Sequence, residues 1–305
     1  MLYENPNLKE SKKISSEIIE TNEVKVKSIK FWKSILLGLN SSGGFFFFGY
    51  NLGVFNILQN YALNIFGWEK ESETALIAIC STLVPIGALF GAIIAGKITG
   101  TRIGRRGSLI LWNLIGLIGN FISIIGDTTS FIVGRLIVGF VCGAFTTVVP
   151  LYIKEYLPIR IQAKGLMMNN TFFAVGVLVG FCLGLNTTAL KTSGDSWWRL
   201  MLCFPSSVGI INCIFFFLIY KYETPKFLVI NKDDPETARI ALTFIYSDES
   251  DVELLLNNLK DLKKFIQENA DAYKITFADL IGPKYKIRFI IAIIFNIGQD
   301  RKSTR

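Results

Sequence analysis

Long apolar runs separated by short charged segments organise the chain. Six runs are near the roughly 20 residues that a helix needs to cross a bilayer. They lie at about 34 to 58, 75 to 96, 108 to 126, 129 to 150, 165 to 186 and 199 to 220. A further apolar run, Phe289 to Gly298, begins close to the last residue. The pattern predicts an all-α multi-pass membrane protein with six spans and the start of a seventh.

The charges between the runs alternate in sign. The segment before the first run is rich in lysine, the segment after it carries Glu69, Glu71 and Glu73, and the segment after the second run is strongly basic. Lysine and arginine collect in the cytoplasmic loops of membrane proteins. We therefore expect the N-terminus and the segments after the second, fourth and sixth spans to be cytoplasmic. The net charge of +8 then reflects topology, and no nucleic-acid partner is expected.

Composition narrows the function classes. Of the 305 residues, 51% are apolar and 13% are aromatic, more than a soluble domain needs for one core. Histidine is absent, which removes histidine-based acid–base catalysis and histidine metal ligands. The five cysteines fall inside apolar runs, where they are expected to be buried small hydrophobes rather than disulfides or metal ligands. With no nucleophile, base or metal constellation in the sequence, we expect neither an enzyme nor a cofactor or metal.

The stretch 134–162, GRLIVGFVCGAFTTVVPLYIKEYLPIRIQ, places an arginine in an apolar run. Because a charge in hydrocarbon is costly, Arg135 is expected near an interface or facing an internal partner. The stretch resembles the fourth membrane helix and following loop of the sugar porters of the major facilitator superfamily, with the pattern G-R-x3-G, then P-x-Y-x2-E-x2-P-x3-R-G. The matching residues are Gly134, Arg135, Gly139, Pro150, Tyr152, Glu155 and Pro158, whereas Gln162 and Ala163 replace the final Arg-Gly.

The segment 96–106, GKITGTRIGRR, resembles the superfamily signature G-x4-D-R-x-G-R-R, with Thr101 in place of the aspartate. Its three arginines can bind carboxylates and helix C-termini. We expect the acidic partners to be Glu155 and Glu223, and Arg135 to lie at the same ends of the helices. The predicted latch, which forms in one state and breaks in another, consists of Arg102, Arg105, Arg106, Arg135, Glu155 and Glu223. Anchoring of the topology by positive charge is the alternative.

The first apolar run contains FGYNLGVFN at 48–56, which closely resembles the F-G-Y-N-x-G-V-x-N of facilitative glucose transporters. Proton-coupled sugar porters generally have F-G-Y-D there. A carboxylate inside a membrane can take up and release a proton, whereas the amide of Asn51 cannot titrate. The sequence therefore favours passive uniport, and the resemblance implies that Phe48 and Asn51 belong to the substrate-binding site.

The fifth run carries two adjacent amides, Asn169 and Asn170. The resemblance places Asn170 where the family has a glutamine that hydrogen-bonds a sugar hydroxyl. Burying an amide is costly unless it lines a polar cavity or bonds across helices. Cavity lining by Asn170 is the favoured reading, and a structural interhelical bond is the alternative. FNIGQ at 295–299 resembles the start of the seventh helix, which implies Gln299 as a second sugar contact.

YETPKFL at 222–228 resembles the P-E-S-P-R-F-L that follows the sixth helix of the family. Beyond it, Asp234 followed by Pro235 is typical of a helix N-cap. A second helix is expected from about residue 250, with an apolar face at Leu255, Leu259, Leu262 and Ile266. The expected organisation is a cytoplasmic tail at 1–33, a six-helix bundle at 34–220, a cytoplasmic helical linker at 221–286, the start of the seventh helix at 287–299 and a non-native tail at 300–305.

The resemblance implies the six-helix N-terminal half of a major facilitator fold, as a truncated chain. The implied function is uniport of a hexose such as glucose by alternating access, in the plasma membrane. The partners implied are the hexose substrate, the lipid bilayer and the missing C-terminal six-helix half. Two alternatives stay open: a proton-coupled sugar symporter, and a non-transporting half-transporter that serves as a membrane subunit or sensor.

Overall fold

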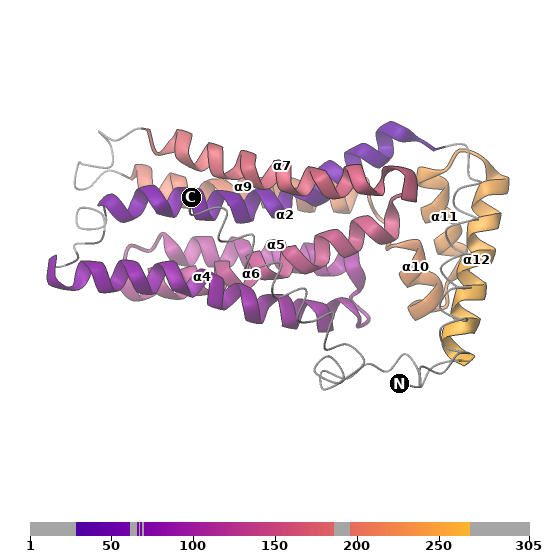
Figure 1. Cartoon of the computed structure of the whole chain (residues 1–305), viewed down its shortest axis with the longest axis horizontal. Helices are drawn as coiled ribbons and strands as arrows, with labels where there is room; N and C mark the ends of the chain where they lie inside the picture. Colours follow the sequence, from indigo (N-terminus) through magenta and orange to yellow (C-terminus); the bar gives the residue numbers. More distant parts are fainter. Residues whose placement is uncertain (1–28, 62–65, 67, 69, 186–195, 269–305) are drawn as a thin grey trace, which may run out of the picture. The chain divides into compact units, whose positions relative to one another are not determined.

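The computed structural model describes residues 29–61, 66, 68, 70–185 and 196–268 (Figure 1). The predicted start of the seventh helix at 287–299, Gln299 and the tail at 300–305 lie outside the described residues. The chain divides into two compact units, Met1–Leu259 and Lys260–Arg305. The helical bundle belongs to the first unit, and the end of one helix, residues 260–268, is the described part of the second.

Six long helices correspond one to one with the six apolar runs. Four of them, within the described residues, are long and apolar enough to cross a membrane by length and composition, namely α4, α6, α7 and α9. The other two, α2 and α5, do not meet this criterion. The bounds are α2 Phe31–Leu58, α4 Lys70–Thr99, α5 Gly104–Ser123, α6 Thr128–Tyr156, α7 Ile159–Leu183 and α9 Trp197–Leu218.

Helices α4 and α6 extend well beyond the apolar runs that predicted them. Pro150, where the apolar run ends, lies inside α6, and this helix continues to Tyr156. A proline removes one intrahelical hydrogen bond, but tertiary packing keeps the helix going. The residue after Tyr156 is extended, and Pro158 precedes the first turn of α7. The sequence signal for the turn is therefore Pro158 rather than Pro150.

The bundle is built from two parallel helix pairs, α2–α7 and α4–α6. Figure 1 shows α2, α7 and α9 along one side, and α4, α5 and α6 along the other. Each pair is in backbone contact through glycines, which are Gly49, Gly53, Gly176 and Gly180 in the first pair and Gly87, Gly91, Gly139 and Gly143 in the second. A Cβ added at Gly49 would lie 2.0 Å from the carbonyl oxygen of Phe173, so no larger residue fits without moving a helix.

Further helical segments follow α9, and up to Leu259 they belong to the same unit as the bundle. They are α10 Pro225–Phe227, the π-helical turn η2 Leu228–Lys232, α11 Pro235–Ile245 and α12 Glu249–Glu268. The predicted N-cap is confirmed, since the Asp234 side chain accepts a hydrogen bond from the backbone N–H of Thr237 at 3.0 Å. Leu228, Leu242 and Leu255 join the same apolar core as Leu37 of α2. Up to Leu259, this segment is therefore an extension of the bundle.

Candidate functional site

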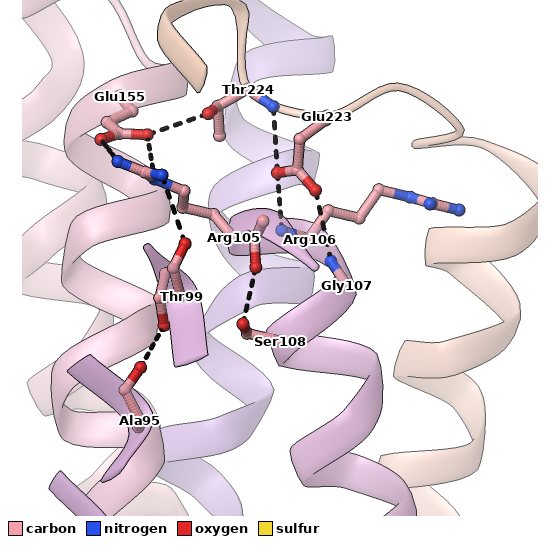
Figure 2. A network of polar contacts seen from close by, with 10 residues as sticks. Ala95, Thr99, Arg105, Arg106, Gly107, Ser108, Glu155, Glu223 and Thr224 are labelled. Atoms are coloured by element: carbon pink, nitrogen blue, oxygen red, sulfur yellow. Dashed lines mark hydrogen bonds and ion pairs between the residues drawn. The ribbon is translucent and has the colours of Figure 1, made fainter. Parts of the chain in front are cut away.

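Charged residues gather where α4, α6 and α9 end and α5 begins, which we call the charged end (Figure 2). Nη2 of Arg105 donates a hydrogen bond to Oε1 of Glu155 at 2.8 Å. Its Nε lies 2.7 Å from Oε2 as an ion-pair contact, without the alignment of a hydrogen bond. The two side chains are 14% and 6% exposed, so water screens this pair little. Arg105 on α5 thereby holds Glu155, one residue before the end of α6.

Two further contacts extend this pair to α4 and to the segment after α9. Nη1 of Arg105 donates to the carbonyl oxygen of Thr99, the last residue of α4, at 3.3 Å. The hydroxyl of Thr224 donates to Oε2 of Glu155 at 2.9 Å. The Arg105 guanidinium also lies 4.8 Å from the centre of the Phe227 ring in α10. One arginine thus joins elements that are distant in sequence.

Glu223 caps the first turn of α5 from outside the helix. Its Oε1 accepts from the backbone N–H of Arg106 at 2.7 Å, and Oε2 accepts from Gly107 N–H at 3.3 Å. The residue at the N-cap position, Ile103, offers no side-chain acceptor. A carboxylate there satisfies free N–H groups and complements the positive end of the helix dipole. Gly104, at φ +76°, leaves room for it, because a Cβ would lie 2.6 Å from Oε2.

Arg106 makes the complementary contact at the end of α9. Its Nε donates to the carbonyl oxygen of Tyr220 at 2.6 Å, and Nη2 donates to that of Phe216 at 2.8 Å. These carbonyls belong to the last turn of α9 and its exit, where a cation complements the negative end of the helix dipole. The start of α5 and the end of α9 therefore cap each other, with charge of the appropriate sign at each.

Two arginines of the predicted latch lie elsewhere. Arg102 is exposed in the turn between α4 and α5. Arg135 lies in α6, 20 residues before Glu155, which at the helical rise of about 1.5 Å per residue is about 30 Å along the axis. The expectation that Arg135 belongs to the charged end is wrong, because Arg135 and Glu155 lie far apart on the same helix.

Arg135 instead contacts the middle of the bundle. It is 2% exposed, and its Nη1 donates to the carbonyl oxygen of Asn51 in α2 at 3.3 Å. The guanidinium lies 4.3 Å from the centre of the Phe55 ring, and its Nε has no hydrogen-bond partner among the described residues. The buried charge is stabilised by a helix carbonyl and an aromatic face. Arg135 therefore faces an internal partner, one of its two expected environments.

The predicted sugar contacts lie along the α2–α7 pair but point in different directions. Asn51 is buried, and its Nδ2 donates to the Phe47 carbonyl of its own helix at 2.9 Å. Phe48 is half-buried and packs edge-on against Phe173 of α7, with ring centres 5.2 Å apart. Asn170 is exposed on α7. Of the three, Asn170 is therefore the side chain that presents a polar group to the open surface.

Sequence reasoning did not identify the partner of the neighbouring amide. Asn169 is buried, and its Oδ1 lies 2.8 Å from the Ser42 hydroxyl oxygen of α2. The only signal in the sequence is Ser41–Ser42 in an otherwise apolar run, and a serine of this kind often bonds to its own helix. The pairing is a long-range contact between residues 127 positions apart.

The cysteines do not all meet the expectation of burial. Cys80, Cys142 and Cys213 are buried, whereas Cys182 is exposed and Cys203 is intermediate. A fully apolar run does not distinguish a residue that faces lipid from one that faces protein. The sequence therefore could not predict that Cys182 and Cys203 are not buried. Among the described residues, no group of three or more histidine, cysteine, aspartate or glutamate side chains could hold a metal ion.

Comparisons with known proteins find similarity to sugar transporters. A family model described as "Sugar (and other) transporter" matches residues 39–301. Hexose transporter 1 of Toxoplasma gondii is 27% identical over 84% of this chain and 48% of that protein. Facilitated glucose transporter member 3 of Ovis aries is 29% identical over 84% and 53%. Hexose transporter 1 of Plasmodium falciparum is 29% identical over 93% and 60%.

Solved structures show the fold. The proton:xylose symporter XylE, of the major facilitator superfamily, superposes with a TM-score of 0.68 at 19% identity, over 78% of this chain and 54% of that chain. The inward-open conformation of XylE from E. coli gives a TM-score of 0.62 at 18% identity, over 80% and 58%. The chain spans about half the length of the curated relatives it matches. With the family model covering most of its residues, the chain belongs to the sugar (and other) transporter family, whose members are transporters and not enzymes.

Proposed function

We propose that the complete gene product carries a hexose across a membrane by facilitated diffusion. The family model and relatives described as hexose or facilitated glucose transporters support a sugar as the substrate. A neutral sugar is recognised by amides, hydroxyls and aromatic faces, and it requires no cofactor. In this proposal the bundle rocks against a second six-helix half around a central site.

The absence of a carboxylate from the interior of the described spans carries the proposal of uniport. Among the described residues, the carboxylates shielded from water are Glu155, one residue before the end of α6, and Glu223, which follows α9, and both are bound at the charged end. Asn51, whose backbone carbonyl accepts a hydrogen bond from Arg135, has a side-chain amide, and an amide cannot exchange a proton near neutral pH. A symporter needs a group that changes charge during the cycle. The lack of such a group inside the described spans thus favours passive transport.

Asn170 is proposed as the principal sugar contact on this half. It is a neutral amide on the exposed surface of α7, able both to donate to and to accept from a sugar hydroxyl. Phe48 and Asn51 contribute through their position on α2, and Gln299 is proposed as a contact from the seventh helix. The lipid bilayer, the second six-helix half and the hexose are the proposed partners, in the plasma membrane with the N-terminus in the cytoplasm.

The charged end is proposed to be cytoplasmic and to stabilise the state in which that side is closed. The Arg105–Glu155 ion pair, the Glu223 cap on the backbone of α5 and the Arg106 contact with the end of α9 fix the ends of these helices relative to one another. Truncating one member of the ion pair leaves the other charge partly buried and uncompensated. The same contacts hold α10 against the bundle, so a movement of the short helices would be transmitted to the spans.

Uptake of labelled hexoses into vesicles that contain the complete gene product tests the proposal. We expect saturable uptake that is unchanged when a protonophore collapses the pH gradient. Uptake that falls to the background level of empty vesicles on addition of the protonophore would instead identify a symporter. Vesicles that bind hexose but do not accumulate or exchange it would identify a sensor.

A further inference from the structure

Ser42 of α2 and Asn169 of α7 form a buried polar contact next to the proposed sugar contact. The Ser42 hydroxyl oxygen lies 2.8 Å from Oδ1 of Asn169 and 2.8 Å from the carbonyl oxygen of Gly38. Ser42 is 0% and Asn169 is 3% exposed. Because an unpaired amide in this environment is costly, the contact favours one arrangement of the two helices.

Proton counting shows how the contact is completed. A hydroxyl has one proton, so Ser42 cannot donate to both oxygen atoms. Both contacts of the Ser42 oxygen are hydrogen bonds when Ser42 donates to the carbonyl oxygen of Gly38 and the Asn169 amide turns its Nδ2 toward the Ser42 oxygen. The result is a hydrogen-bond chain from Asn169 through Ser42 to the backbone of α2, in which each bond polarises the next.

This contact determines which way Asn170 points. Successive residues of an α-helix are rotated by about 100°, so an inward Asn169 turns Asn170 outward onto the open surface. Further along the pair, glycine contacts at Gly49 and Gly176 hold the helix backbones together. At the level of Asn169 the nearest glycine of α7, Gly165, meets the side chain of Leu157 and not α2. The polar contact therefore sets the rotation of α7 at this level.

We propose that Asn169, held by Ser42, is a positioning residue that aims Asn170 at the sugar. This inference rests on the proposed function, because it assumes that Asn170 binds the substrate. Asn169 does not touch the sugar in this proposal. Its loss lets α7 rotate by a small angle about its axis, which displaces the Asn170 amide from the sugar hydroxyl and weakens binding without altering the rate of the conformational cycle.

Measurement of hexose uptake kinetics and thermal stability in single variants tests the positioning role. Asn169→Ala and Ser42→Ala are each expected to raise KM by about two- to twelvefold, the range for one hydrogen bond lost, with kcat within about twofold. The double variant is expected to show no more than the larger single effect, since both residues act through one contact. Exchanging the residues, Ser42→Asn with Asn169→Ser, is expected to restore KM toward the parent value.

The chain offers a matched control in another buried amide–hydroxyl pair. Nδ2 of Asn120 in α5 donates to the Ser206 hydroxyl of α9 at 3.0 Å, and both residues are buried. Asn120→Ala is expected to lower thermal stability and leave KM unchanged. If Asn169→Ala behaves in the same way, its contact is structural only and the positioning role is overturned.

The two proposals fail differently. If the parent protein transports hexoses and the KM of Asn169→Ala or Ser42→Ala is unchanged, only the positioning role is overturned. If the parent protein transports no hexose, the proposed function is overturned and the positioning role with it. Should Asn169→Ala not fold, Ser42→Ala removes the same contact with a smaller change in volume, and an unchanged KM in that variant overturns the proposal.

Discussion

The helix pairs α2–α7 and α4–α6 are packed alike but carry different polar groups. In each pair two glycines of each helix face the backbone of the other helix, and the helices run parallel in backbone contact. In α2–α7, the Ser42–Asn169 contact at 2.8 Å lies between the glycine contacts and the charged end. The corresponding position of α4–α6 has the Thr147 hydroxyl 3.5 Å from the Ala92 carbonyl oxygen, a weak contact.

The charges are divided just as unequally. The α4–α6 pair carries Arg135 two turns after the start of α6 and Glu155 near the end of α6, whereas the described buried side chains of α2 and α7 are neutral. Glycine spacing therefore sets the distance between helices in both pairs, and the polar side chains decide what each pair does. We expect α4–α6 to govern conformational state through charge and α2–α7 to govern substrate recognition through neutral amides.

Replacing a packing glycine is expected to have the largest effect, and the same effect in both pairs. A Cβ at Gly143 would lie 1.9 Å from the Ala88 carbonyl oxygen, and one at Gly49 would lie 2.0 Å from that of Phe173. Gly143→Ala and Gly49→Ala should each destabilise the protein by about 3 kcal/mol, at the upper end for overpacking. Thermal unfolding in detergent measures this. Gly96→Ala, with no atom within 4 Å, is the control and should not destabilise the protein, because alanine favours a helix over glycine by about 0.5–1 kcal/mol. A loss in only one pair would contradict their similarity.

Glu155→Gln is expected to have the next largest effect and to act on conformation. It removes the charge that compensates Arg105 while keeping the shape of the side chain, at a cost of about 1.5–3 kcal/mol for a hydrogen bond to a charged group. We expect lower turnover, a population shifted toward the state open at the charged end, and a smaller change in sugar affinity. Cysteine labelling from the side of the charged end measures the shift.

The exposed ion pair Arg239–Glu249 provides the control for Glu155→Gln. Arg239→Gln should change stability by less than about 1 kcal/mol, as exposed ion pairs contribute little. Unchanged labelling and normal turnover in Glu155→Gln would mean that the arginines of the charged end only anchor topology.

Asn51→Asp gives the α2–α7 pair a titratable group and so tests the division of charge. The new carboxylate would lie in α2 where Arg135 contacts the helix, and it could take up and release a proton during the cycle. We expect uptake to become severalfold dependent on external pH, whereas parent uptake is insensitive. Asn56→Asp, on an exposed position of α2, is the control and should add no pH dependence. A parent protein as pH-dependent as Asn51→Asp would refute the assignment of uniport.

Asn170→Ala is expected to have the smallest effect, confined to binding. One hydrogen bond to a neutral hydroxyl contributes about 0.5–1.5 kcal/mol, or about two- to twelvefold in apparent affinity. Equilibrium binding of labelled hexose measures it, with thermal stability unchanged. Thr171→Ala serves as the control, since the Thr171 hydroxyl already bonds to the Met167 carbonyl of its own helix. Reduced stability with normal affinity would make Asn170 a packing residue.

The sequence by itself determined the local features of this fold. Six apolar runs predicted six long helices, and Asp234 before Pro235 predicted the start of α11. Glu155 and Glu223 could be named as candidate partners of the arginines because charges of opposite sign at helix ends attract. Each of these signals depends on a residue and its near neighbours in the chain.

Only the tertiary structure decided which way each residue faces. The spans are apolar on all sides, so their pattern could not tell that Asn169 points inward and Asn170 outward, or that Cys182 is exposed. Arg135 donates to a backbone carbonyl of α2, and Glu223 accepts from backbone N–H groups of α5. Because every residue has these backbone groups, the residue types in the sequence could not identify them as partners. Burial direction and backbone partners follow from long-range packing, because a helix can present any side to its neighbours until those neighbours are in place.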